Sequence, residues 1–395
     1  MLPSFTFHSA GSLVFGRDSV QQLGEIAGRL KAGRILIVSD PILVKAGVVE
    51  RALAPLLAAG VTCEVFAGCV PEPPVEVVRA GVAAARAFRP DALLGLGGGS
   101  NMDAAKLVAL VLAHGGDATD WVGDSRVPGP VFPLICVPTT AGTGSEVSAA
   151  AVFTDTAKKM KVSTLSPYLR PAFAVVDPLL TVGCPKQVTA DSGIDALTHA
   201  VEAYTAVGQT EFLKRPGGAS VYQGKNPLSD AMALECIRLV GKFLTRAVND
   251  GDDLDARDGM ALAATLGGLA FANAGVALVH AMEYPVGGAV HVSHGAGNGL
   301  LLPHVMKYHL DCRSHEIAEI GDRLGGISTA DGAIAHIERL RAEIGIPLRL
   351  RDLGVTEAML PGFAEKAFAI KRLMRVNPRM PASADEILDI YRAAF

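Results

Sequence analysis

The stretch DALLGLGGGSNMDAAKLVAL, residues 91–110, joins an aliphatic run to an alanine-rich helical segment through three consecutive glycines. The run 91–97 predicts a buried strand, and the helix is expected to begin near Met102. Glycines at such a turn let a ligand approach the backbone closely, and the free amides at the start of a helix suit a pyrophosphate. The stretch therefore predicts an α/β unit whose candidate phosphate contacts are Gly97, Gly98, Gly99 and Ser100.

A second glycine-rich turn, PTTAGTGSE at 138–146, follows the aliphatic run 133–138 and carries Thr139, Thr140 and Thr143. Either turn alone is more often a plain connection between a strand and a helix. Two such turns at neighbouring strand ends favour a dinucleotide, because ligands collect at the carboxyl ends of the strands in open α/β sheets.

Asp40 ends another aliphatic run, RILIVSD at 34–40. A carboxylate at the end of such a strand can accept hydrogen bonds from the adenosine ribose hydroxyls, and it would repel a 2′-phosphate. This placement favours NAD over NADP. The alternative is that Asp40 only caps the turn before Pro41.

The pattern of strand and helix signals in the sequence changes after about Asp177. Before it, predicted strands at 34–40, 61–67, 91–97 and 133–138 alternate with helical segments at 19–30 and 75–88. After it, long alanine- and leucine-rich segments lack strand signals, and the glycines and prolines of 205–230 predict a long loop. We therefore predict an α/β dinucleotide-binding domain at 1–180 and an all-helical domain at 181–395.

Asp195 and His199 lie four residues apart in DSGIDALTHAVEAY, residues 191–204, so a helix would project both from one face. Taken alone, the pair could equally be a buried hydrogen bond. The segment 273–304 adds four of the ten histidines, at 280, 291, 294 and 304. One carboxylate and three imidazoles suit Fe(II) or Zn(II), with a position left for a substrate oxygen.

Composition excludes several other classes of function. The net charge of −4 gives no basic field that would draw the chain to nucleic acid or to an anionic membrane. The six cysteines form no CxxC pair, and the first residues lack the basic and apolar regions of a secretory leader. We expect a cytoplasmic enzyme whose partners are small molecules.

In chain order the sequence contains GGGSNMDAAK, PTTAGTGSE, GIDALTHAVEAY, NPLSDAMALECIRLV, NAGVALVHAM and HGAGNGLLLPHV. These segments resemble the signature segments of the iron-containing (group III) alcohol dehydrogenase family over nearly the whole chain. The resemblance implies a dehydroquinate-synthase-like fold, with NAD(P) on the α/β domain, the metal on the helical domain and the reaction in the cleft between them. It also implies a homo-oligomer, for which a homodimer is the simplest expectation.

The resemblance also implies roles for individual positions. The implied metal ligands are Asp195, His199, His280 and His294. The implied dinucleotide contacts are Gly97 to Ser100, Asp103, Asp40, Thr139, Thr140, Thr143 and Lys161, with Phe271 near the nicotinamide. The implied reaction interconverts a primary alcohol or hydroxy acid with its aldehyde or ketone by hydride transfer, while the metal polarises the substrate oxygen.

The chain departs from the family pattern at two positions. Tyr284 stands where many relatives have a second histidine, HxxxHP, and Glu72 stands where many have the asparagine of PNPT. Together with the segment 205–230, these departures resemble the hydroxyacid-oxoacid transhydrogenase branch, which passes hydride between 4-hydroxybutyrate and 2-oxoglutarate with a tightly held cofactor. A dehydroquinate-synthase-like lyase is a further alternative, although its glutamate-led metal site is absent from the sequence.

Two further groups of residues are candidates for roles in the reaction. His291 and Tyr284 could relay the hydroxyl proton to solvent, or they could be structural. The far carboxylate of a hydroxy acid could be held by cations of the segment 205–230, namely Lys214, Arg215 and Lys225. Basic residues of a loop are otherwise simply solvated.

Overall fold

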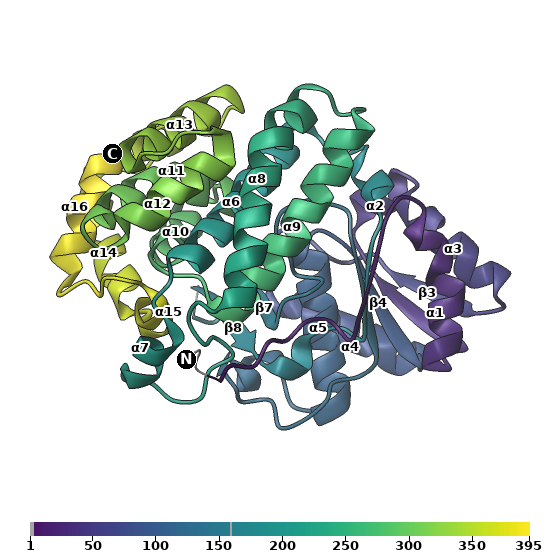
Figure 1. Cartoon of the computed structure of the whole chain (residues 1–395). Coiled ribbons are helices and arrows are strands. Elements are labelled where there is room, and N and C mark those ends of the chain that lie inside the picture. The colour runs from purple at the N-terminus through teal and green to yellow at the C-terminus, as the bar shows by residue number, and fades with distance from the viewer. Residues whose placement is uncertain (1–3, 159) are drawn as a thin grey trace.

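The computed structural model describes residues 4–158 and 160–395, and its first half is built on a parallel sheet (Figure 1). In spatial order the six strands are β1 (Ser12–Phe15), β9 (Phe173–Val176), β6 (Leu134–Pro138), β4 (Ala92–Gly97), β2 (Arg34–Val38) and β3 (Thr62–Phe66). The four predicted strands are confirmed as β2, β3, β4 and β6. The sequence analysis missed β1 and β9, which are only four residues long.

Helices cover both faces of this sheet. Ile35 and Ile37 of β2 pack with α1 (Leu23–Leu30) and α3 (Val48–Ala58) in one buried cluster. Leu36 and Val38 of the same strand pack with α4 (Val75–Phe88) and α5 (Gly99–His114) on the other face. Successive side chains of a strand point to opposite faces, so a strand that is buried on both reads as a continuous apolar run.

A second sheet of three strands lies beside the first. Its order is β5 (Gly123–Asp124), β8 (Met160–Leu165) and β7 (Ala150–Asp155), with β7 and β8 antiparallel. The sequence analysis did not predict it. Lys161 and Ser163 are two residues apart on β8, so they point to the same side, and both meet helices of the second half.

From Lys186 to the last residue, every regular element that the structure describes is a helix, as predicted. The central helix α6 (Lys186–Thr205) is buried almost throughout from Thr189 onward. The other helices are α7 (Gln209–Lys214), α8 (Pro227–Asn249), α9 (Leu254–Ala274), α10 (Leu278–Val290), α11 (His294–Tyr308), α12 (Leu310–Gly325), α13 (Ala330–Glu343), α14 (Leu360–Ala369), α15 (Lys371–Val376) and α16 (Ala384–Ala394). The division between the halves at 180/181 stays a prediction.

The predicted loop at 205–230 is wrong in part, because it contains α7 and the start of α8. The side chain of Asn226 accepts hydrogen bonds from the amides of Leu228 and Ser229 at 3.1 Å each, and it caps α8. A six-residue helix such as α7 is too short to show helical periodicity in the sequence.

The beginning of the described chain lies against the helical half (Figure 1). The amide of His8 donates to Asn273 Oδ1 at 2.8 Å, and Asn273 Nδ2 donates to the carbonyl of His8 at 2.9 Å. This contact ties the sheet side of the chain to α9.

Among the described helices, none is by itself long and apolar enough to cross a membrane. Helices α9 and α10 meet the length and hydropathy requirement only together, and they meet at an angle of 106°.

Candidate active site

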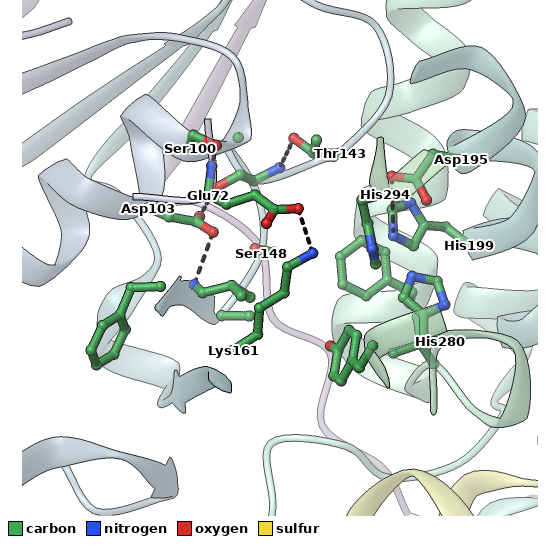
Figure 2. Close-up of a pocket in the computed structure, with 18 of the residues that line it drawn as sticks. Glu72, Ser100, Asp103, Thr143, Ser148, Lys161, Asp195, His199, His280 and His294 are labelled. Atoms are coloured by element: carbon green, nitrogen blue, oxygen red, sulfur yellow. Dashed lines mark hydrogen bonds and ion pairs between the residues drawn. The ribbon is translucent and has the colours of Figure 1, made fainter. Parts of the chain in front are cut away.

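A cavity lies between the carboxyl ends of the strands and the helical half (Figure 2). From the α/β side it is lined by Glu72, Gly99, Ser100, Asp103, Thr143 and Lys161. From the helical side it is lined by Asp195, His199, Phe271, His280, Tyr284 and His294. The structure therefore brings together candidate residues from positions as far apart as 99 and 294.

The glycine turn between β4 and α5 has no room for a side chain at Gly97 or at Gly99. Gly97 has φ +143°, and a Cβ there would lie 2.0 Å from Asn101 Nδ2. A Cβ on Gly99 would lie 2.9 Å from Thr143 Cγ2, so the two glycine-rich turns touch. The amide of Thr139 donates to the carbonyl of Gly97 at 3.0 Å, which joins the turns through the backbone. The start of α5 is thus open to a ligand at close range.

Asp103 and Ser145 hold the two turns in register. Ser145 Oγ donates to Asp103 Oδ1 at 2.6 Å, and the amide of Val152 donates to Asp103 Oδ2 at 2.9 Å. The buried ammonium of Lys106 donates to Ser145 Oγ at 2.9 Å. Burial raises the pKa of Asp103 despite the nearby charge of Lys106. Both oxygens of Asp103 are already engaged, so we interpret this carboxyl as a support of the turn.

Some of the predicted dinucleotide contacts lie outside the cavity wall. Gly97, Gly98, Thr139 and Thr140 are not among its lining residues, although a Cβ on Gly98 would be 3.7 Å from Thr140. Gly99 and Thr143, which belong to the same two turns, do line the cavity.

Asp40 caps a helix, as in the alternative interpretation. Its Oδ1 accepts hydrogen bonds from the amides of Ile42 at 2.8 Å and Leu43 at 3.0 Å, at the start of α2 (Pro41–Lys45). Its Oδ2 accepts one from Asn101 Nδ2 at 2.7 Å. A role toward ribose stays a prediction.

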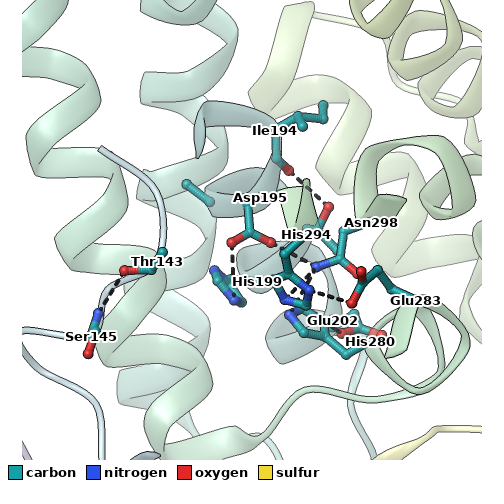
Figure 3. Close-up of polar contacts among 12 residues, drawn as sticks. Thr143, Ser145, Ile194, Asp195, His199, Glu202, His280, Glu283, His294 and Asn298 are labelled. Atoms are coloured by element: carbon teal, nitrogen blue, oxygen red, sulfur yellow. Dashed lines mark hydrogen bonds and ion pairs between the residues drawn. The ribbon is translucent and has the colours of Figure 1, made fainter. Parts of the chain in front are cut away.

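Four candidate donors meet on the helical side (Figure 3). Asp195 comes from α6, His280 from α10 and His294 from α11, and their donor atoms all lie within 4.8 Å of one another. His199 lies beside them, with Nε2 3.9 Å from Asp195 Oδ2 and its ring stacked on Phe271 at 4.2 Å. His199 Nδ1 is buried and has no hydrogen-bond partner among the described residues.

Carboxylates behind the cluster fix two of the imidazoles. Glu202 Oε2 lies 2.6 Å from His280 Nδ1, and Glu283 Oε2 is hydrogen-bonded to His294 Nδ1. Because these carboxylates keep a proton on each Nδ1, the lone pair of each Nε2 can bind a metal ion. Asn298 Nδ2 donates to Asp195 Oδ1 at 2.8 Å. The same nitrogen lies 3.3 Å from His280 Nε2 and 3.2 Å from His294 Nε2.

The sequence analysis missed Glu202, Glu283 and Asn298. Helical spacing could have pointed to all three, because Glu202 follows His199 by three residues, Glu283 follows His280 by three and Asn298 follows His294 by four. It could not have given the partners of the two carboxylates, because each contacts an imidazole of another helix.

Charges within the cluster shift the ionisation of its members. Burial alone would raise the pKa of Asp195, but the surrounding imidazoles bring it below its ordinary value. Burial lowers the pKa of His199 to about 4. Burial would also lower the pKa of His294, but Glu283 and Asp195 raise it to about 9. An anionic carboxylate with imidazoles aimed at the same point fits a divalent first-row metal ion, which would displace the proton of His294.

The remaining predicted residues have different outcomes. Lys161, Phe271 and Tyr284 line the cavity. His291 does not, because it is exposed, with φ +54°, and ends α10 with its backbone in the left-handed conformation. The geometry gives no support to a proton relay through His291.

Of the two interpretations of the cations in 205–230, capture of a substrate carboxylate gains no support for Arg215 and Lys225, because neither lines the cavity. Arg215 donates to the carbonyls of Arg375, Asn377 and Pro378, so its guanidinium holds the end of α15 and the residues just after it. Lys225 Nζ lies 4.4 Å from the centre of the Tyr204 ring and 3.5 Å from Asp230 Oδ2. Lys214 is exposed and is absent from the cavity wall. From that segment, Tyr222 is the residue that lines the cavity.

Comparison with known proteins identifies relatives over the full length of the chain. A family model described as iron-containing alcohol dehydrogenase matches residues 10–178, and the C-terminal model of the same family matches 219–395. Long-chain-alcohol dehydrogenase 1 of Geobacillus thermodenitrificans is 40% identical over 96% of this chain and 94% of its own.

Solved structures agree with this similarity. A crystal structure of 1,3-propanediol oxidoreductase superposes with a TM-score of 0.92 at 38% identity, covering 100% of both chains. Sulfoacetaldehyde reductase from Bifidobacterium kashiwanohense, solved in complex with NAD+, gives 0.86 at 26% identity over 100% of this chain and 99% of its own.

Proposed function

The chain belongs to the iron-containing alcohol dehydrogenase family, and from that premise we propose that it transfers hydride between a small primary alcohol and NAD. One Fe(II) ion is the proposed metal, and Zn(II) could bind the same donors. The observation that supports the proposal most is one cavity that combines an open glycine turn with three clustered donors, Asp195, His280 and His294, and with His199 beside them.

Asp195, His199, His280 and His294 would hold the ion. When bound, it supplies Lewis acidity that lowers the pKa of an alcohol oxygen. Glu202 and Glu283 keep a proton on the Nδ1 atoms of two imidazoles, which orients the opposite nitrogens toward the ion. Asn298 steadies the carboxylate of Asp195.

The dinucleotide would lie along the glycine turn. Its pyrophosphate suits the amides at the start of α5, and its nicotinamide supplies the hydride acceptor. Ser100, Glu72, Lys161 and Phe271 all line the cavity that the metal cluster also lines, so a dinucleotide on the turn could bring its nicotinamide end to the cluster. Phe271 stacks on His199 and excludes water from that end.

The cavity beside the cluster suits a short carbon chain. Its wall there contains Tyr222, Phe271, Val276 and Tyr284. Such a wall holds an aliphatic substrate by apolar contact and leaves its hydroxyl for the metal side. A small primary alcohol and its aldehyde are therefore the proposed substrate pair.

A hydroxy acid is the second candidate substrate, and Arg372 favours it. Its guanidinium carbon lies 5.5 Å from the ring centre of Tyr222, and its Nη2 donates to Ser163 Oγ at 3.3 Å. Burial raises the pKa of the Tyr284 phenol, and the charge of Arg372 nearby offsets part of this rise. Arg372 is not part of the cavity wall, but it neighbours two tyrosines that are, so a movement of these phenols would let it hold the far carboxylate of a substrate.

The first test follows absorbance at the reduced-nicotinamide band with Fe(II), NAD and a panel of alcohols and hydroxy acids. We expect turnover that is lost on chelation and restored by Fe(II). No reduction of NAD by any member of the panel would overturn the proposal. Turnover of 4-hydroxybutyrate that needs 2-oxoglutarate and no free NAD would favour the transhydrogenase alternative.

The second candidate has its own test. Arg372→Leu should lower kcat/KM for 4-hydroxybutyrate by about 10- to 100-fold, since a charge-assisted hydrogen bond contributes 1.5–3 kcal/mol, and should spare butan-1-ol. Lys371→Leu, at the exposed neighbouring position, is the matched control. Equal loss for both substrates would remove the hydroxy acid from consideration.

A further inference from the structure

Lys161 lies between two carboxylates that belong to different parts of the site. Its Nζ is 2.5 Å from Glu72 Oε1 and 4.0 Å from Glu283 Oε1. Figure 2 shows the side chain pointing to Glu72, midway between the glycine turn and the imidazoles. Because Glu283 is also bonded to His294, these four residues link the proposed cofactor site to the proposed metal site.

Glu72 stands at the dinucleotide end of this link. Its amide donates to Ser100 Oγ at 3.2 Å, and its carbonyl accepts a bond from Thr154 Oγ1 at 3.3 Å. The backbone of Glu72 has φ +52°, a left-handed conformation that these contacts hold in place. Its side chain is 34% exposed, so a ligand in the cavity can reach the carboxylate.

Glu283 stands at the metal end and is fully buried. One of its oxygens bonds His294, but Oε1 has no hydrogen-bond partner among the residues described. A buried carboxylate oxygen without a partner is unfavourable, so Glu283 would gain from a closer approach of Lys161.

Gly287 leaves the space for that approach. A Cβ at this position would lie 2.3 Å from Glu283 Oε1 and 3.1 Å from Lys161 Nζ. The adjacent Gly288 has nothing within 4 Å of its Cβ position. The gap between the ammonium and the second carboxylate therefore depends on glycine at 287.

We propose that Lys161 exchanges between Glu72 and Glu283, and that a bound dinucleotide thereby lowers the metal affinity of the helical half. The inference rests on the proposed function. Ribose hydroxyls near the nicotinamide would engage the carboxylate of Glu72 and release Lys161. At Glu283 the ammonium then offsets the negative charge that supports His294 and brings a positive charge nearer to the metal.

The coupling is reciprocal, so it can be measured from either site. With Zn(II) as a redox-inert probe, chelator competition gives the metal Kd of the full chain with and without saturating NADH. We expect NADH to weaken Zn(II) binding by about 5- to 10-fold, and Zn(II) to weaken NADH binding by the same factor. Nicotinamide fluorescence reports the second affinity independently of any turnover.

Three variants locate the coupling. In Glu72→Gln, Lys161 keeps only Glu283 as a carboxylate partner, so the NADH-free protein should already bind Zn(II) as weakly as the wild type with NADH. Lys161→Met should abolish the coupling. Gly287→Ala should reduce it by obstructing the move, whereas Gly288→Ala on the same helix should keep it.

Binding of both ligands with no coupling in the wild type would overturn the inference and leave the proposed function intact. Equal coupling in the wild type and in Lys161→Met would do the same. If Lys161→Met does not fold, Glu72→Gln decides, because wild-type Zn(II) affinity in that variant contradicts the exchange. A chain that binds neither Zn(II) nor NADH would overturn the proposed function together with the inference.

Discussion

The α/β half and the helical half build their parts of the cavity in different ways. On the α/β side the turn at 97–100 depends on the absence of side chains, and its neighbours are joined largely through the backbone. On the helical side the donors are side chains from α6, α10 and α11, and each position depends on another buried group. One region is specified locally, and the other is specified by packing between distant segments.

This difference predicts that the two ligand sites can be damaged separately. A substitution of one of the imidazoles should remove the metal. It should leave the glycine turn at 97–100 intact, because the backbone of that turn is not held by the imidazoles. The exception is the link through Lys161, where the two regions meet.

His280→Ala should give the largest separation. Loss of one of four donors should weaken Zn(II) or Fe(II) binding by more than about 100-fold, since even partners behind the ligands are worth 10- to 100-fold. NADH affinity should stay within about threefold, allowing for the coupling through Lys161. Metal analysis of the purified variant and NADH fluorescence measure the two effects. Stoichiometric metal in the variant would contradict the assignment of His280 as a metal ligand.

Glu202→Gln should give a smaller effect of the same kind. The neutral side chain of glutamine has one acceptor oxygen for the two donors that Glu202 holds, His280 Nδ1 and the amide of Val279, so metal affinity should fall by about 10- to 100-fold. Glu211→Gln, on the exposed side of α7, is the control. If metal affinity is unchanged in Glu202→Gln, packing alone orients His280.

Local signals explain what the sequence could predict. The strand before 97, the glycine turn and the helix after it are adjacent in the chain, so their order alone determines the geometry. The i, i+4 spacing of Asp195 and His199 put them on one face of α6. The other donors could be assigned only by family resemblance, because His280 and His294 lie on other helices.

The failures of prediction come from long-range contacts. Nothing near Arg215 in the sequence indicates that carbonyls at the end of α15 and just after it will bind its guanidinium. Arg372 is separated from the tyrosine at 222 by most of the helical half, yet the two are neighbours. The missed pair of β7 and β8 is an exception, because these two antiparallel strands are neighbours in the sequence.

Asp40→Asn should separate the two interpretations of Asp40. Asparagine caps a helix about as well as aspartate, so α2 should keep its stability. Loss of the charge should narrow the preference for NAD over NADP in kcat/KM by about 10-fold, or roughly 1.4 kcal/mol. An unchanged ratio, measured beside an unchanged Tm, would leave only the cap seen in the structure.

Acid should weaken the helical half through His309, which is 4% exposed. Burial, aided by Arg313, lowers the pKa of His309 to about 3, below the 6.5 of an unperturbed histidine. The unfolded chain therefore binds the extra proton, and stability that is complete above pH 6.5 falls as the pH drops toward 3. The slope is at most about 1.4 kcal/mol per pH unit.

Urea unfolding by circular dichroism, which follows mainly the helices, should show this slope between pH 6.5 and 5. Trp121, the single tryptophan of the chain, lies in the α/β half. Its fluorescence should report a smaller pH dependence of stability if the two halves unfold separately. His309→Gln should reduce the dichroism slope but not abolish it, because burial also lowers the pKa of His199 and of His304 to about 4. The same slope in the variant would assign the acid sensitivity to other groups.

Hydride transfer inside the shared cavity is the central claim, and isotope transfer tests it most directly. The Fe(II)-loaded chain is incubated with NAD and with propan-1-ol that carries two deuterium atoms on C1. The mass of the reduced cofactor is then measured by mass spectrometry. The account predicts reduced cofactor carrying one deuterium, in the wild type but not in His280→Ala. Reduced cofactor without deuterium, or equal transfer by His280→Ala, would contradict it.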